Sequence, residues 1–272
     1  MDEIGNLLFE LYLMIYRIAL LCSNFKKSAD VEYYIYILIL LYLSERSTKF
    51  EIYFHAHFYL ACNDVFRDVG IILDVSGSMY PQPIVVANEF ISEFVKIANF
   101  TQNGSHGALT IFSDRLALKP HEMFKIKFSD QLNVDDYLED VKSITEKAPR
   151  NKQTDIIYGL EVSLSKMFQT NSGMRQDALQ VAVLITDGLS NDDSPISAYE
   201  AKADMFNENK IRVLVVAVDD YNPKKLLKLV KFPEHFFKAE KFEDLLGNIT
   251  EIIGALICEG MIPQFYVIYD YN

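Results

Sequence analysis

The sequence contains little cysteine and no excess of positive charge. Three cysteines in 272 residues are too few for a scaffold built on disulfides, and they lack the paired spacing of a structural zinc site. Lysine and arginine total 26 against 38 aspartate and glutamate residues, which gives a net charge of −12. No basic cluster follows any predicted face, so binding to the phosphates of nucleic acid is not expected. An acidic surface suits a cation site or a basic partner better.

The overall composition is that of a folded protein. Hydrophobic residues make up 50% of the chain and charged residues 24%, which excludes a disordered polymer and a collagen-like repeat. At roughly 150 residues per domain, the length allows one domain with an extension, or two small domains.

The first 62 residues differ from the rest, because they hold 8 of the 16 tyrosines and long runs of Leu and Ile. Residues 33–43 form an unbroken apolar run of 11, about half of what a membrane-spanning helix needs but the length of a signal-peptide core. The run begins too late for an ordinary signal, so a later true start, a membrane anchor and a buried strand all stay open. We therefore expect a leader, anchor or mis-assigned extension at 1–62, a domain at 63–260 and a tail at 261–272.

The domain shows a regular alternation of strands and helices. Apolar runs predict buried strands at 69–73, 179–185 and 213–218, with shorter strands at 108–112 and 116–118. Helical spacing of apolar residues predicts helices at 84–98, 134–144, 156–168, 198–209 and 242–256. This order indicates an α/β fold with a doubly wound, mostly parallel central sheet and helices on both faces.

Oxygen-bearing side chains follow two of the buried strands. Asp74, Ser76 and Ser78 come after the first strand, and Asp187 follows the strand at 179–185. Because the carboxyl ends of parallel strands meet at one edge, these side chains should converge there with Thr154, which precedes a predicted helix. Hard oxygen donors without Cys or His suit Mg²⁺ or Mn²⁺. With only two carboxylates in the set, such a cation would accept an incoming Asp or Glu carboxylate from a partner.

The strings Asp74-x-Ser76-x-Ser78 and Thr186-Asp187-Gly188, with Thr154 between them, resemble a von Willebrand factor type A domain with an intact metal-ion-dependent adhesion site. The resemblance covers about residues 66–260 and implies a three-layer α/β fold. It also implies that Ser76, Ser78 and Thr154 bind the metal directly, while Asp74 and Asp187 act through waters and hydrogen bonds.

The second loop departs from the family pattern. Many members have Thr-x-Thr-Gly where this chain reads Thr154-Asp155-Ile156-Ile157-Tyr158-Gly159, so Asp155 is an alternative ligand. Its other interpretation is a carboxylate in the first turn of a helix, where the dipole favours negative charge. Tyr80, directly after the first loop, is a candidate ligand contact, although Pro81 beside it more simply begins a helix.

Covalent features depend on the compartment. In the extracellular proteins that this chain resembles, a disulfide often joins the domain ends, which implies a bond between Cys62 and Cys258; two free thiols are the alternative. Glycosylation triplets begin at Asn99, Asn103 and Asn248. These features favour an extracellular or secreted protein over a membrane-anchored or cytoplasmic one.

The resemblance implies an adhesion or recognition module that captures an acidic side chain of a protein partner through Mg²⁺ or Mn²⁺. An intracellular scaffold subunit of the same fold is the alternative. A metal-dependent phosphohydrolase is disfavoured, because none of the five histidines lies in the metal loops, which are residues 74–78, 154–155 and 186–188. Neither Gly-x-Ser-x-Gly nor Gly-x-x-x-x-Gly-Lys occurs. We expect no enzyme activity, and membrane contact only through residues 1–62 if they are retained.

Overall fold

The computed structural model describes residues 66–101, 104–130, 132–149, 153–188, 193–218 and 223–258. All of them belong to the unit that runs from Phe58 to Asn272. The predictions for the first 62 residues, the tail at 261–272, Cys62 and Asn103 lie outside the described residues. In the part of the chain that is described, no helix is both long and apolar enough to cross a membrane.

A six-stranded sheet forms the centre, in the order β3-β2-β1-β4-β5-β6. All neighbouring strands are parallel except β2 and β3, which are antiparallel, so the predicted mostly parallel sheet is confirmed. The strands are β1 (Arg67–Asp74), β2 (His106–Phe112), β3 (Phe124–Ile126), β4 (Leu179–Thr186), β5 (Ile211–Val218) and β6 (Phe236–Ala239).

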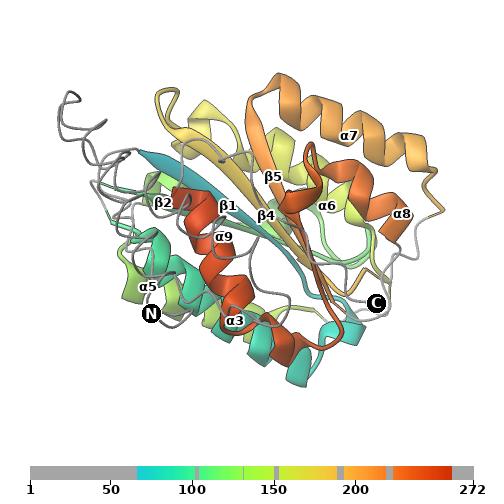
Figure 1. Ribbon diagram of the computed structural model, residues 1–272, viewed down its shortest axis with the longest axis horizontal. Coiled ribbons are helices and arrows are strands. Elements are labelled where there is room, and N and C mark those ends of the chain that lie inside the picture. Colours follow the sequence, from blue (N-terminus) through green and yellow to red (C-terminus); the bar gives the residue numbers. More distant parts are fainter. Residues whose placement is uncertain are drawn as a thin grey trace, which may run out of the picture. The chain divides into compact units, whose positions relative to one another are not determined.

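Helices cover both faces of this sheet (Figure 1). One layer contains α3 (Gln82–Ala98), α5 (Val134–Lys147) and α9 (Asn248–Cys258), and the other contains α6 (Ile156–Val162), α7 (Ile196–Glu208) and α8 (Pro223–Leu226). The short helix α4 spans Pro120–Met123, and a π-helical turn at Ser163–Met167 continues α6. Turns of 3₁₀ helix lie at Gly77–Met79, Phe128–Asp130, Thr170–Ser172, Leu227–Leu229, Pro233–His235 and Phe242–Leu245.

The central strands carry apolar residues on both sides because helices cover both faces of the sheet. Every residue of β1 and β2 is buried, as expected for strands covered by helices on each face. Helix α3 buries a stripe against the sheet that includes Phe90, Ile91 and Phe94, each fully buried and each contributing about 1.5–3 kcal/mol of transfer free energy. The helix ends at Asn99, which adopts the left-handed conformation with φ 51°.

The strand predicted at 116–118 is wrong, because these residues form a turn and the next strand is β3. The turn is fixed by Asp114, whose Oδ1 accepts hydrogen bonds from the backbone N–H of Leu116 at 2.6 Å and of Ala117 at 2.8 Å. A carboxylate that satisfies two successive amides replaces the strand partner that those amides would need.

The last helix begins later than its apolar pattern predicts. Phe242–Leu245 forms a separate 3₁₀ turn, and α9 starts at Asn248. Gly247 between them has φ 87°, a left-handed conformation that ends the first turn. Thr250 then joins the two pieces, since its Oγ1 donates to the backbone oxygen of Leu245 at 3.0 Å.

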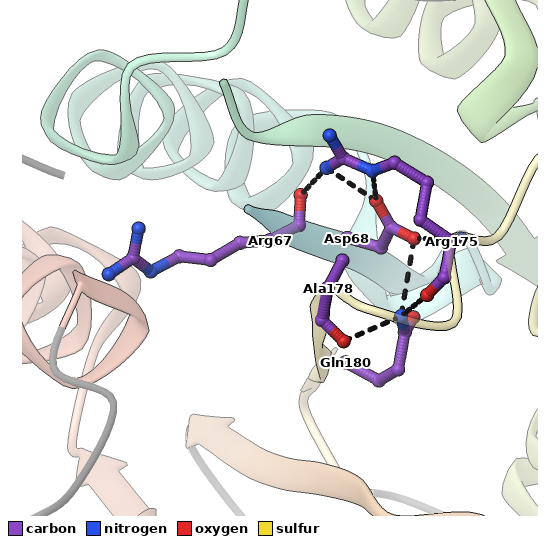
Figure 2. Close-up of polar contacts among 5 residues, drawn as sticks. All are labelled: Arg67, Asp68, Arg175, Ala178 and Gln180. Atoms are coloured by element: carbon purple, nitrogen blue, oxygen red, sulfur yellow. Dashed lines mark hydrogen bonds and ion pairs between the residues drawn. The ribbon is translucent and has the colours of Figure 1, made fainter. Parts of the chain in front are cut away.

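A polar cluster holds the amino end of β1 (Figure 2). The buried carboxylate of Asp68 receives the Arg175 side chain, with Nε at 2.8 Å and Nη2 at 2.7 Å from Oδ1. Its Oδ2 accepts the Arg175 backbone N–H at 2.6 Å and Gln180 Nε2 at 3.2 Å. Arg175 Nη2 also donates to the backbone oxygen of Arg67 at 2.6 Å. The segment before β4 is thereby tied to the start of β1.

Two arginines at the amino ends of β1 and β5 reach the last turn of α9. Arg67 Nε donates to the backbone oxygen of Ile257 at 2.7 Å, and Arg212 Nη1 donates to that of Leu256 at 2.9 Å. In Figure 2 the Arg67 side chain points away from Asp68. Cationic groups at a helix carboxyl end satisfy free carbonyls and complement the dipole. The beginning of β1 and the end of α9 are therefore joined directly.

Candidate metal centre

Asp74 is the last residue of β1 and is fully buried at the carboxyl edge of the sheet. Its Oδ1 accepts the backbone N–H of Ser76 at 2.9 Å, and its Oδ2 accepts the hydroxyl of Thr186 at 2.7 Å. Both carboxylate oxygens are thus fixed, one by the loop that follows β1 and the other by the last residue of β4. This arrangement suits a group that orients and charges a site, as the family resemblance implies for this aspartate.

Two serine hydroxyls lie side by side in the turn that follows. Ser76 Oγ and Ser78 Oγ are 3.1 Å apart; Ser76 is buried, whereas Ser78 is exposed. Neighbouring ligands of an octahedral Mg²⁺, with metal–oxygen bonds of about 2.1 Å, lie about 3.0 Å apart. The spacing of the two hydroxyls therefore fits two adjacent positions around one such ion, with the exposed serine on the side open to a partner.

A second buried carboxylate lies near the first. Asp187 follows β4 and is 3% exposed. Burial, and then the negative charge of Asp187, raise the pKa of Asp74 to about 7. Two buried carboxylates that repel each other are stabilised by a cation between or beside them. The loop around Asp187 is held by Thr186, whose hydroxyl accepts the backbone N–H of Gly188 at 3.0 Å.

Thr154 is buried, on a segment joined to the loop after β2. Ser113 Oγ donates to the backbone oxygen of Gln153 at 2.9 Å. The backbone N–H of Asp155 donates to the backbone oxygen of Ser113 at 3.1 Å. The end of β2 also lies beside the loop that follows β1, because Val75 N–H donates to the backbone oxygen of Phe112 at 2.8 Å. Thr154 therefore lies at the same edge of the sheet as Asp74.

Asp155 is the N-cap of α6, where its Oδ1 accepts the backbone N–H of Tyr158 at 2.8 Å. Its Oδ2 lies 2.6 Å from Arg115 Nε, and the Arg115 guanidinium is 4.8 Å from the centre of the Tyr158 ring. Since both carboxylate oxygens already have partners, the geometry favours capping over metal ligation for Asp155.

Tyr80 stands at the rim of the site. Its side chain is 44% exposed, and a cis peptide bond joins it to Pro81, the N-cap of α3. The helix start predicted at this proline is therefore confirmed. Tyr80 and Ser76 also line the same small hollow, and the role of Tyr80 as a ligand contact stays a prediction.

The remaining predicted positions lie away from this edge or are only partly described. Asn99 is exposed at the end of α3, and Asn248 and Cys258 are the first and last residues of α9. The third member of the last glycosylation triplet, Thr250, is buried with its hydroxyl bonded inside the fold. Glycosylation and the disulfide stay predictions.

Thr186 belongs to the site, although the sequence motif alone did not indicate its role. Its hydroxyl connects the end of β4 to Asp74, and its position at a strand end directly before Asp187 was the available signal. Among the described residues, no group of three or more His, Cys, Asp or Glu could hold a metal. A cation here would need the serine and threonine hydroxyls, which are the ligands that the resemblance implies.

Three comparisons with known proteins agree with this architecture. A family model described as the von Willebrand factor type A domain matches residues 68–252. Integrin alpha-11 from Homo sapiens is 24% identical over 201 residues, 71% of this chain and 16% of its own length. The collagen alpha-6(VI) chain from Homo sapiens is 28% identical over 193 residues, 70% of this chain and 8% of its own. Manganese-loaded TRAP protein from Plasmodium vivax matches with a TM-score of 0.55 at 16% identity, covering 72% of this chain and 74% of that one.

Proposed function

The chain belongs to the von Willebrand factor type A domain family, and from this premise we propose that it is a divalent-cation-dependent protein-binding module. In this proposal the carboxyl edge of the sheet holds Mg²⁺ or Mn²⁺ and captures an acidic side chain of a protein partner. The observation that carries it is the pair of serine hydroxyls 3.1 Å apart beside two buried, mutually repelling carboxylates.

The residues divide into two groups by their bonding. Ser76, Ser78 and Thr154 would hold the cation directly, because hydroxyl oxygens are hard donors. Asp74, with both oxygens occupied by hydrogen bonds, and the buried Asp187 would supply negative charge around it. The bound cation supplies a coordination position with enough uncompensated charge to accept a carboxylate from outside.

The similar proteins support the proposal without extending to a partner. This chain spans 16% of integrin alpha-11 and 8% of the collagen alpha-6(VI) chain, so neither protein's partners carry over. The similar TRAP protein is loaded with manganese, which supports a divalent cation for the shared fold. Integrins and collagens are adhesion and matrix proteins, which favours an extracellular, non-enzymatic role for this chain. We propose the Cys62–Cys258 disulfide and the glycans as features of that same role.

The test is calorimetric titration of the full chain with MgCl₂ or MnCl₂, with and without a short peptide that contains one glutamate. We expect metal to bind the wild type, and the peptide to strengthen that binding. Ser76→Ala and Asp187→Ala should abolish both effects. Ser165→Ala and Asp140→Ala are matched controls, because both residues are exposed on helical segments outside the metal loops.

Thermal unfolding gives an independent measure. A cation at a hundredfold excess over its Kd should stabilise the wild type by about 2.7 kcal/mol and leave both loop variants unchanged. If the wild type binds no metal at millimolar concentration, the proposal is wrong and the domain is a metal-independent interaction module. If Ser76→Ala binds metal as well as the wild type, the cation does not lie at the serine pair and the proposed site is wrong.

A further inference from the structure

A hollow of about 190 Å³ lies between the edge of the sheet and the carboxyl end of α5. Its apolar part consists of Ile111 from β2, with Ile144, Ala148 and Pro149 from the end of α5 and beyond. Ile111 and Ala148 are buried, whereas Ile144 is partly exposed and Pro149 is exposed. An apolar side chain from outside would therefore contact mainly Ile144 and Pro149.

Two lysines stand at the same hollow. Lys125 comes from the edge strand β3 and Lys147 from the last turn of α5, and both are exposed. Lys147 Nζ donates to the hydroxyl of Ser143 at 2.8 Å. Within the described ranges neither lysine takes part in a salt bridge. The charge of Lys125 also acts on Glu122, whose pKa is lowered first by a hydrogen bond from the Lys119 backbone N–H and in small part by Lys125. In a chain of net charge −12, two ammonium groups at one hollow still form a local site for negative charge.

This hollow adjoins the candidate metal centre. Ala148 lines it and also lines the smaller hollow that contains Ser76 and Tyr80. Thr145, one turn earlier on α5, lines the smaller hollow as well. The two hollows therefore meet at Ala148, and we refer to them together as the groove. Ser76 and Tyr80 line one end of it, and Lys125 and Lys147 line the other.

We propose that this groove binds the segment of the partner next to the captured carboxylate, and that the segment carries an apolar residue followed by a second acidic residue. The apolar side chain fills the hollow over Ile144 and Pro149, and the second carboxylate pairs with Lys125 and Lys147. The inference rests on the proposed function, which it extends from one acidic residue to an acidic–apolar–acidic recognition pattern. Charge complementarity and continuity with the metal loops carry it.

The test measures fluorescence anisotropy of labelled synthetic peptides with the full chain in MnCl₂. A single-acid peptide has one Glu in a Gly/Ser background. A series of two-acid peptides adds a Leu and a second Glu at increasing spacing, and matched peptides replace the second Glu by Gln. At one spacing the two-acid peptide should bind about five- to tenfold tighter than the single-acid peptide, with an advantage that shrinks at high salt.

Lysine variants separate the groove from the metal. Lys125→Ser/Lys147→Ser should reduce two-acid binding to the single-acid level and leave single-acid binding unchanged. Lys142→Ser is the matched control, since this lysine is exposed on α5 but does not line the hollow. Thermal unfolding of each variant checks that the fold is retained.

Each other outcome overturns the inference in a distinguishable way. If single-acid peptides bind but no spacing adds affinity, or if the added affinity survives in the double lysine variant, the groove proposal fails and the metal proposal stands. If no peptide binds in MnCl₂, both proposals fail. If two-acid binding depends on the lysines but is unchanged in EDTA, the hollow acts alone and the two-point pattern is wrong.

Discussion

The ion pair between Asp68 and Arg175 should contribute more to stability than any exposed pair in the domain. Replacing Arg175 by Met removes the guanidinium and keeps much of the side-chain volume. Asp68 is fully buried, and the Arg175 side chain is only 20% exposed, so solvent cannot replace the lost partner. The change would leave a buried carboxylate with two remaining donors, the backbone N–H of residue 175 and Gln180 Nε2 (Figure 2).

The magnitude follows from the bonds removed. Arg175→Met deletes two contacts to Asp68 Oδ1, at 2.8 and 2.7 Å, and one to the backbone oxygen of Arg67 at 2.6 Å. Removing one partner of a buried ion pair typically costs about 3–5 kcal/mol. For a domain of this size that corresponds to a loss of about 10 °C in Tm. Asp68→Asn/Arg175→Met should cost clearly less than Arg175→Met alone, because no charge is then left unpaired.

Urea unfolding followed by circular dichroism measures these free energies for the single and double variants. Arg115→Met is the matched control: the Arg115 side chain is 55% exposed, so loss of its pair with Asp155 should cost less than about 1 kcal/mol. The reasoning would be refuted if Arg175→Met cost no more than Arg115→Met, or if the effects at positions 68 and 175 were additive.

Two further predictions concern a buried histidine and a buried glycine. Burial, and then the charge of Arg212, lower the pKa of His235 to about 4, against a small opposing effect of Glu234. Between about pH 6.5 and 4 the His235 imidazole is therefore protonated in the unfolded chain but not in the folded one. The neutral histidine contributes up to about 3 kcal/mol to the free energy of unfolding above pH 6.5, and this contribution is lost as the pH falls toward 4. Urea titrations across this range should show a shallower decline for His235→Gln, and an identical decline would contradict the assignment. Gly159→Val should destabilise by about 1–3 kcal/mol, since even a Cβ there would lie 2.6 Å from Cγ of the Phe112 ring; unchanged urea unfolding would contradict this packing.

The parts of the fold that could be predicted are those with a strong local pattern. The strands at 69–73 and 213–218 are continuous apolar runs, which a sheet covered on both faces requires. The edge strands β3 and β6 were missed because each is short and contains an exposed lysine, so neither shows an apolar run or clear alternation.

The candidate site was predictable to the same extent. Asp74 and Asp187 were identified because each lies at the carboxyl end of a strand, and parallel topology brings strand ends together. The bond from Thr186 to Asp74 joins residues 112 positions apart, and the hollow at Lys125 and Lys147 combines an edge strand with a helix end. Such contacts depend on packing between distant segments, for which a single sequence carries no local signal.

The hydrogen bond from Arg67 to Ile257 has a mechanical consequence. It joins the first residue of β1 to the penultimate residue of α9, so tension applied between these two points loads that bond and the end of the helix first. The serine pair lies beyond the other end of β1, whose eight residues span about 23 Å. Tension between Arg67 and Ile257 would therefore act about one strand length away from the candidate metal centre.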